Sequence, residues 1–167
     1  MNQSRPIAPT AGPAASAALS PALPGRADLT GCPWHDVKAK LRDVGLRPTR
    51  QRMALGWILF AKGDRHVTAE QLHEEAVGAK VRVSLATVYN SLHQFTQMGL
   101  LREVVVEPGR SYFDTNTSDH HHFFFEEEGR LMDIAGDRVE VSRLPSPPAG
   151  THLKRVDVIL RLSGRER

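Results

Sequence analysis

Three consecutive histidines, His120 to His122, are the residues of this sequence best suited to chemistry. The aromatic run from Phe123 to Phe125 follows them and predicts a β-strand through the whole stretch. Because alternate residues of a strand project to the same face, we expect His120 and His122 to point together and His121 to point away. Two convergent imidazoles supply half of a divalent-metal site. The alternative is a polar surface with only fortuitous affinity for metals.

A second segment, residues 84–102, predicts a helix suited to DNA. Leu85, Val88, Leu92 and Phe95 recur at helical spacing and form one apolar stripe. The other face carries hydroxyl, amide, phenol and imidazole groups, and no acidic residue occurs in residues 76–102. Such a face suits a major groove lined by phosphates, where these groups can read base edges. An ordinary solvated helix face is the alternative.

The elements before this helix must position it. Apolar spacing predicts helices near residues 34–44 and 48–62, and the second begins beside Arg47, Arg50 and Arg52. Thr68 and Gln71 have the spacing of a capping box, which predicts the start of a third helix. The third helix, a short connection and the polar helix together make a helix-turn-helix.

The remaining chain predicts strands. Residues 104–106 and 111–113 have the composition of β-strands and flank a Pro-Gly turn, which predicts a hairpin. This hairpin would be the wing of a winged helix. Arg110 lies at its tip, where it could contact phosphates or the minor groove of DNA. Further strand patterns occur at residues 120–125, 131–134 and 156–162. These few strands cannot close a core alone. We therefore expect this half to pair with a second copy, as paired DNA half-sites require.

The patterns together predict an α+β fold class. We expect a winged helix-turn-helix DNA-binding domain at residues 32–114, a small α/β dimerisation and ligand-sensing domain at residues 115–167, and a disordered Ala/Pro-rich tail at residues 1–31. The net charge is +3, and the single cysteine excludes a disulfide framework and a Cys-only zinc site. No stretch predicts a membrane span or a signal peptide, so we expect a cytoplasmic protein.

The order of several motifs resembles a known family. Residues 66–72 (HVTAEQL), residues 84–90 (SLATVYN) and the histidine cluster are similar to the ferric uptake regulator superfamily, over about residues 38–162. Residues 31–37 (GCPWHDV), residues 47–57 (RPTRQRMALGW) and the three histidines resemble its iron response regulator branch of alphaproteobacteria. The resemblance implies a homodimer, or a higher oligomer, that binds a double-stranded DNA operator and represses or activates genes of iron and haem metabolism. In this branch haem is the usual signal and relieves DNA binding.

The resemblance also implies ligand sites. The superfamily's regulatory metal site corresponds to His66, Asp114, His120 and His122, a donor set suited to Fe, Mn or Zn. The branch's haem ligands correspond to Cys32, to His35 as a second ligand, and to His120, His121 and His122. For Cys32 an inert thiol is the alternative. Phe125 and Glu128 stand where commoner members carry a Cys-x-x-Cys pair, so we expect no structural thiolate zinc.

For DNA, the resemblance places Tyr89 and Asn90 at base edges, with Ser84 and Thr87 near phosphate. It places Arg47 in the adjacent minor groove, and it places Arg50 and Arg52 on the DNA backbone.

Other functions fit the same residues. The runner-up in the same class is a sensor of zinc, manganese or peroxide. The alternative from another class is a haem-binding module or a metalloenzyme that uses the histidine cluster. The sequence has no HExxH or GxSxG motif and no obvious nucleophile, so we predict no enzymatic activity.

Overall fold

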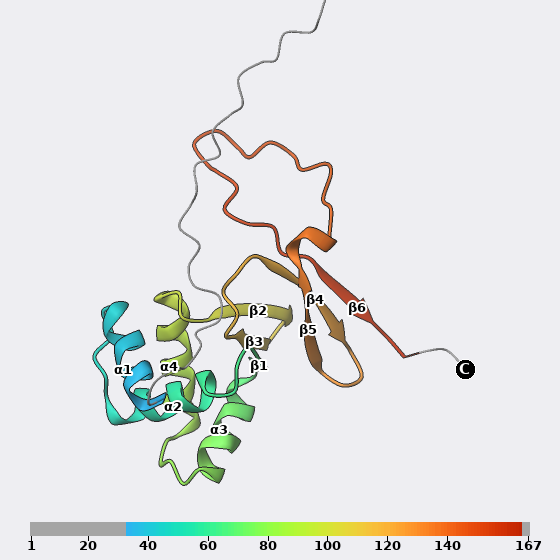
Figure 1. The fold of residues 1–167 in the computed structure, drawn as a ribbon. Coiled ribbons are helices and arrows are strands. Elements are labelled where there is room, and N and C mark those ends of the chain that lie inside the picture. Colours follow the sequence, from blue (N-terminus) through green and yellow to red (C-terminus); the bar gives the residue numbers. More distant parts are fainter. Residues whose placement is uncertain (1–32, 165–167) are drawn as a thin grey trace, which may run out of the picture.

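The computed structural model describes residues 33–164, which contain both helices and strands (Figure 1). In chain order the elements are α1 (Pro33–Asp43), α2 (Arg50–Phe60), β1 (His66–Val67), α3 (Ala69–Gly78), α4 (Leu85–Gln97), β2 (Arg102–Glu107), β3 (Arg110–Asp114), β4 (His120–Phe125), β5 (Arg130–Ala135), the short 3-10 helix η1 (Gly136–Arg138) and β6 (Ile159–Leu162). The predicted α+β class is confirmed. The predicted tail and Cys32 lie outside the described residues. No described helix has the length and apolar content needed to cross a membrane.

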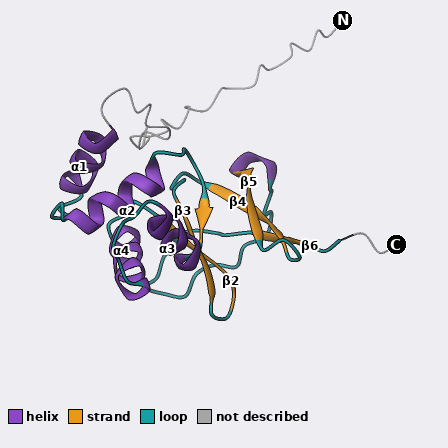
Figure 2. Cartoon of the chain, turned by 90° about the horizontal axis from the view of Figure 1, so that it is seen from below, coloured by secondary structure: helices purple, strands orange, loops and turns teal. Residues whose placement is uncertain are grey.

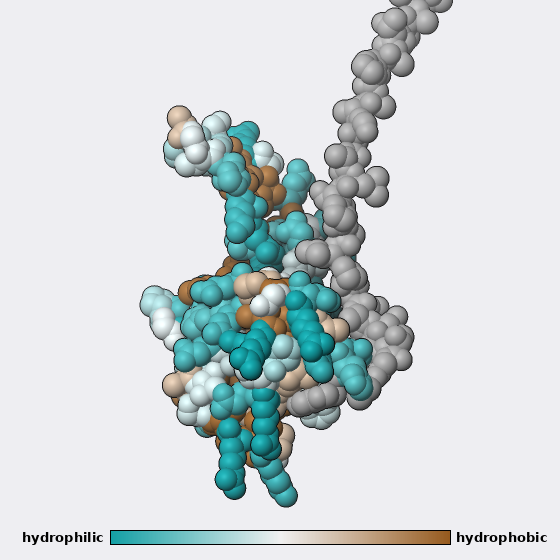
Figure 3. Space-filling view, turned by 90° about the vertical axis from the view of Figure 1, so that its left-hand side faces the viewer, coloured by the Kyte–Doolittle hydropathy of each residue, from teal (hydrophilic) through white to brown (hydrophobic). Residues whose placement is uncertain are grey.

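The four α-helices gather on one side of the molecule and the strands on the other (Figures 1 and 2). Seen from the helical side, the surface is largely hydrophilic (Figure 3). Thr68 and Gln71 form the predicted capping box, which satisfies backbone donors at the start of α3. The helices enclose a core of apolar side chains, whose buried members are Val37, Leu41, Met53, Leu55, Ile58, Leu59, Val67, Ala69, Leu72, Ala76, Val88, Leu92, Phe95, Leu100, Leu101 and Phe113.

Helix α4 packs on this core through a stripe that differs from the predicted one at its start. Val88, Leu92 and Phe95 are fully buried, but Leu85 is 37% exposed. Leu85 is the first residue of the helix and precedes the turn that meets the core. Ser91 takes the fourth place in the stripe, and its hydroxyl donates to the carbonyl of Thr87 at 2.9 Å.

The first sheet has the strand order β1-β3-β2, and the antiparallel pair β2–β3 forms the predicted hairpin. Alternate residues of β2 are buried, so Val104 and Val106 face inward and Val105 faces solvent. The register places both His66 and Arg102 opposite Asp114. Its β2–β3 hairpin follows α4 directly in the chain, so it connects the polar helix to the histidine strand.

The second sheet has the order β5-β4-β6, with β4 antiparallel to β5 and parallel to β6. The predicted strand at residues 156–162 is shorter than expected, because its pairing with β4 begins only where Ile159 meets His122. One residue earlier, the backbone N–H of Val158 donates to Nδ1 of His121 at 3.4 Å instead of to a strand carbonyl.

A second apolar cluster lies between the two sheets. Val104, Val106 and Tyr112 come from the wing, and Phe124 and Leu131 come from the second sheet. The hydroxyl of Tyr112 also donates to the carbonyl of Gly129 at 2.6 Å, a bond that joins the sheets. The predicted division between residues 114 and 115 stays a prediction, and apolar packing continues across it.

Candidate metal centre

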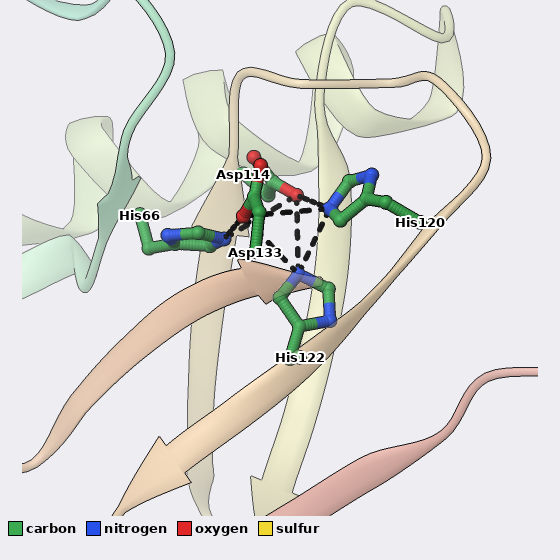
Figure 4. Close-up of side chains that lie close together, drawn as sticks. All are labelled: His66, Asp114, His120, His122 and Asp133. Atoms are coloured by element: carbon green, nitrogen blue, oxygen red, sulfur yellow. Dashed lines mark hydrogen bonds and ion pairs between the residues drawn. The ribbon is translucent and has the colours of Figure 1, made fainter. Parts of the chain in front are cut away.

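Five side chains from four strands converge between the two sheets (Figure 4). They are His66 on β1, Asp114 on β3, His120 and His122 on β4, and Asp133 on β5. One ligand atom from each residue lies within 4.8 Å of the ligand atoms of the others. Three imidazoles and two carboxylates from two sheets therefore face one small volume.

Strand register explains this convergence. The β1–β3 pairing sets His66 opposite Asp114, and the β4–β5 pairing sets His122 opposite Asp133. His120 and His122 project to the same face of β4, as alternation predicts, and their Nε2 atoms lie 3.0 Å apart.

Asp114 lies at the centre of the group and is fully buried. One of its oxygens, Oδ2, lies 2.9 Å from Nε2 of His120, 3.4 Å from Nε2 of His122 and 3.5 Å from Nε2 of His66. Burial alone would raise the pKa of this carboxyl, but its close contacts with the rings of His120, His122 and His66 hold that pKa well below its usual range. Asp114 is therefore a permanent anion at the centre.

Residues of the 115–119 connection fix the orientation of these ligands. The backbone N–H of Asn116 donates to Oδ1 of Asp114 at 2.8 Å, and the Asn116 amide donates to Oδ2 of Asp133 at 2.8 Å. Nδ1 of His120 lies 2.9 Å from the carbonyl of Ser118, which selects the tautomer with the proton on Nδ1. Such outer partners leave Nε2 of His120 with a lone pair for a cation.

The centre fits a divalent metal ion. Nε2 of His66 is buried and makes no hydrogen bond, although it lies 2.9 Å from Oδ1 of Asp133. Three imidazole and two carboxylate donors suit Fe(II), Mn(II) or Zn(II). Burial opposes the charged form of His66, but Asp114 and Asp133 raise the pKa of His66 to about 9. A metal ion would therefore displace a proton from His66 when it binds.

Asp133 is the residue that sequence reasoning missed. It lies in the predicted strand at residues 131–134, where an acid among apolar residues is a weak signal. Its relation to the histidines depends on the β4–β5 register, because a shift of one residue would turn its carboxylate to the other face. Its carboxylate remains one-third exposed, so it forms the solvent side of the centre.

His121 lies on the opposite face of β4, away from the five-residue centre. It is 7% exposed and borders a hollow of about 510 Å³ beside the 139–158 segment. The lining residues are Thr117, Asp119, His121, Gly136, Val139, Val141, Leu144, Lys154, Arg155 and Val156. His35 is exposed on α1, on the far side of the helices from β4 (Figure 1). The histidines predicted to bind haem thus lie in three separate places.

The side chains predicted to contact DNA lie along α2, α4 and the wing. Tyr89 and Asn90 are exposed on α4, whereas Ser84 caps that helix and bonds to Thr87 at 2.9 Å. The exposed Arg47 and Arg50 flank the first turn of α2. Two other arginines are engaged within the chain: Arg52 donates to Gln94 on α4 at 2.7 Å, and Arg110 lies over the rings of Tyr112 and Phe124.

Phe125 and Glu128 stand where commoner family members carry a Cys-x-x-Cys pair, and Arg130 contacts both of them. Arg130 lies 4.1 Å from the ring centroid of Phe125, and its Nε donates to Glu128 at 2.9 Å. A cation–π contact and an ion pair therefore link the ends of the β4–β5 turn.

The fold and this centre define a winged-helix protein with a candidate metal site between its wing sheet and a second sheet. The sequence model of the ferric uptake regulator family matches residues 43–160. The chain is 33% identical over 107 residues to the peroxide-responsive repressor PerR of Staphylococcus aureus strain Mu50, an alignment that spans 64% of this chain and 72% of the relative. The chain belongs to the ferric uptake regulator family.

Solved structures of this family share the fold. The ferric uptake regulator of Pseudomonas aeruginosa, solved with manganese, has a TM-score of 0.61 at 24% identity and covers 78% of this chain and 98% of its own. The ferric uptake regulator of Vibrio cholerae has a TM-score of 0.60 at 22% identity, with coverages of 76% and 98%. A zinc-bound manganese uptake regulator has a TM-score of 0.56 at 20% identity, with coverages of 77% and 98%.

Proposed function

We propose that this chain is a homodimeric, sequence-specific DNA-binding regulator of iron and haem homeostasis genes in the cytoplasm, and that a divalent metal ion and haem control its DNA binding. The observation that carries the proposal is that the five metal-ligand side chains of the candidate centre come from two different sheets. Two of them come from the wing sheet, whose strands β1 and β2–β3 lie on either side of α4 in the chain, and three come from the second sheet. A bound cation would tie these two sheets together and so bias the position of the DNA-binding helices.

DNA binding is assigned to α4 and its neighbours, including the predicted contacts Arg47, Arg50, Arg52, Ser84, Thr87, Tyr89, Asn90 and Arg110. Long hydrophilic side chains project at the end of the molecule where α3 and the start of α4 lie (Figures 1 and 3). The connection between these helices carries Lys80 and Arg82, both exposed. Cations at this end would attract the phosphate backbone and hold α4 against the groove.

Iron, manganese and zinc all fit the donor set. The likeness to structures described with manganese or zinc supports a first-row divalent ion. Binding of Mn²⁺ to the full chain by titration calorimetry, with loss of the binding heat in His122→Ala, tests this part. Unchanged Mn²⁺ affinity in that variant would contradict it.

Haem is assigned to the other face of β4, in contact with His121. The neighbouring hollow offers apolar side chains for a macrocycle and the cations Lys154 and Arg155 for propionates. Nε2 atoms of His120 and His122 already face Asp114, so metal and haem would occupy opposite faces. His35 on α1 would form a separate contact, distant from β4, and Cys32, outside the described residues, is the proposed thiolate ligand.

Haem titration followed by the Soret band separates these assignments. His121→Ala should lose affinity for haem and keep its affinity for Mn²⁺, and His122→Ala should do the reverse. Cys32→Ala should remove only a thiolate-type band. Wild-type haem spectra in both His121→Ala and Cys32→Ala would contradict the haem assignment.

The homodimer is assigned to the second sheet. Strand β6 is an edge strand, and Leu160 and Leu162 on it are 40% and 37% exposed. An edge with exposed apolar side chains is suited to pairing with a second copy. Leu160→Glu should shift sedimentation toward the monomer and weaken binding to paired half-sites.

A peroxide sensor in the same family is the second candidate, because the chain is similar to a peroxide-responsive repressor. Genomic footprinting with iron plentiful, with iron scarce and after peroxide treatment separates the two. Footprints that respond to iron or haem support the proposal, and footprints released only by peroxide favour the second candidate.

A further inference from the structure

A carboxylate on α3 holds the exposed tyrosine of α4. The hydroxyl of Tyr89 donates to Oε1 of Glu70 at 2.6 Å. Glu70 lies in the first turn of α3, and both side chains are exposed at the surface that carries α4. This short bond joins the two helices of the helix-turn-helix through their surface side chains.

The ring of Tyr89 is held by a second contact. His93 lies one turn later on α4, and its ring stacks on Tyr89 with centroids 6.3 Å apart and an interplanar angle of 22°. The ring of His93 in turn meets the buried Phe113 of β3 edge-on, at 5.9 Å. Tyr89 is therefore fixed at its ring by α4 and at its hydroxyl by α3.

The bond to Glu70 determines what the phenol can offer to DNA. A phenol has one proton to donate, and an oxygen whose proton is engaged can only accept. The hydrogen bond from Tyr89 lowers the pKa of Glu70, and the same bond raises the pKa of Tyr89. The carboxylate therefore stays ionised near neutral pH, and the phenol stays protonated.

We propose that Glu70 is a specificity-determining positioning residue, which makes Tyr89 a hydrogen-bond acceptor toward the DNA bases. This inference rests on the DNA-reading role proposed for α4. In the major groove adenine and cytosine present amino donors, whereas guanine presents only the acceptors O6 and N7. Tyr89 therefore selects a base with an amino group, and the negative charge of Glu70 reinforces the rejection of guanine.

The test is selection from a random duplex library by the full-length protein loaded with Mn²⁺, followed by sequencing. Tyr89→Phe identifies the base pair that the hydroxyl reads, because its preference for adenine or cytosine disappears there. Glu70→Ala frees the proton of Tyr89, so guanine at that base pair should become about five- to tenfold more frequent relative to adenine and cytosine. Glu70→Gln keeps an accepting oxygen and should retain most of the wild-type preference.

Glu74→Gln is the matched control, because it removes an acid from the exposed face of the same helix. It should strengthen binding to all duplexes and leave the base preference unchanged. The proposal is overturned if Glu70→Ala has the wild-type preference, or if Tyr89→Phe keeps its preference for an amino-bearing base. If Glu70→Ala fails to fold, Glu70→Leu, which also cannot accept the proton of Tyr89, takes its place, and a wild-type base preference in that variant overturns the proposal. A wild-type protein that enriches no sequence would instead contradict the proposed function.

Discussion

The helical region (residues 33–114) and the second-sheet region (residues 120–162) are held together by different forces. The helical region buries large apolar side chains completely, among them Leu41, Leu59 and Phe95. Among its described residues the second-sheet region buries only the apolar side chains of Phe124, Leu131 and Ile134, and it leaves exposed those of Met132, Val141, Leu144, Leu153, Leu160 and Leu162. Buried apolar area stabilises by about 25 cal/mol per Å². Most of the stabilisation from apolar burial therefore lies in the helical region, and the second-sheet region depends more on contacts with other groups.

Some of those contacts are apolar, in the cluster between the two sheets, and others are polar contacts that cross between the regions. Arg102, at the start of β2, is buried and donates to the carbonyl of His120 at 3.0 Å and to the carboxylate of Asp157. The candidate metal centre spans the same boundary. Parts of proteins that respond to ligands are usually those of low local stability. The comparison indicates that the helical region is the more stable part of the chain and the second-sheet region the more responsive one.

The largest expected effect concerns the helical core. Phe95→Ala should lower the free energy of unfolding by about 3–5 kcal/mol, because it opens a cavity in a packed interior. Ile134→Ala, at an 8% exposed position of the second sheet, should cost no more than about 2 kcal/mol. Urea unfolding measures both. Equal losses would refute the contrast between the two regions.

Metal binding should stabilise the second-sheet region next most strongly. At a Mn²⁺ concentration about 100 times the Kd, the free energy of unfolding should rise by about 2.7 kcal/mol. EDTA should reverse the gain, and His122→Ala should abolish it. His152→Ala changes an exposed histidine of the 139–158 segment and serves as the control. A gain that survives in His122→Ala would place the metal elsewhere.

The Arg102 contacts should contribute about 2 kcal/mol, the range for hydrogen bonds to charged groups. Asp157→Asn removes the carboxylate that the buried Arg102 shares with Arg155, whose Nε lies 2.8 Å from it, and the free energy of unfolding measured in urea should fall by about that amount. Asp119→Asn is the matched control, because Asp119 is 85% exposed and lies 4.0 Å from Arg155. A loss in the control as large as in Asp157→Asn would mean that the effect is not specific to Arg102.

A smaller effect depends on pH and belongs to the helical region. Hydrogen bonds from Arg65 and, to a smaller extent, from Lys62 lower the pKa of Glu75 from 4.5 to about 2. They outweigh burial, which alone would raise it. A carboxyl with a depressed pKa stabilises the fold above the unfolded pKa, and this contribution disappears as pH falls toward 2. Glu75 is 27% exposed, so the screened contribution is about 1 kcal/mol. Glu75→Gln should reduce the loss of stability between pH 5 and pH 2, and an unchanged slope would contradict this assignment.

The smallest effect concerns the connection between α3 and α4. Lys80 adopts φ 59°, a left-handed conformation that glycine adopts more easily. Lys80→Gly should therefore raise the free energy of unfolding by about 0.5 kcal/mol. If Lys80 contacts a phosphate, the same variant should bind all duplexes more weakly. The slope of its logarithmic affinity against logarithmic salt concentration should then be smaller by about one. Unchanged salt dependence would remove Lys80 from the DNA surface.

Much of the helical region followed from local sequence. The capping box at Thr68, the apolar stripe of α4 and the Pro-Gly turn of the wing each lie within one short segment, and all three agree with the structure. The exception is Leu85, which was predicted to be part of the apolar stripe and is 37% exposed. It lies at a helix end, where periodicity cannot tell whether the core reaches that far.

The sequence by itself determined which face each histidine of β4 takes, because alternation along a strand is a local property. Only the tertiary structure decided that Asp133 completes the centre, that His121 borders a separate hollow, and that Glu70 holds Tyr89. Each of these depends on strand register or on the crossing of two helices. Both arise from packing between distant segments, which no single stretch of sequence encodes.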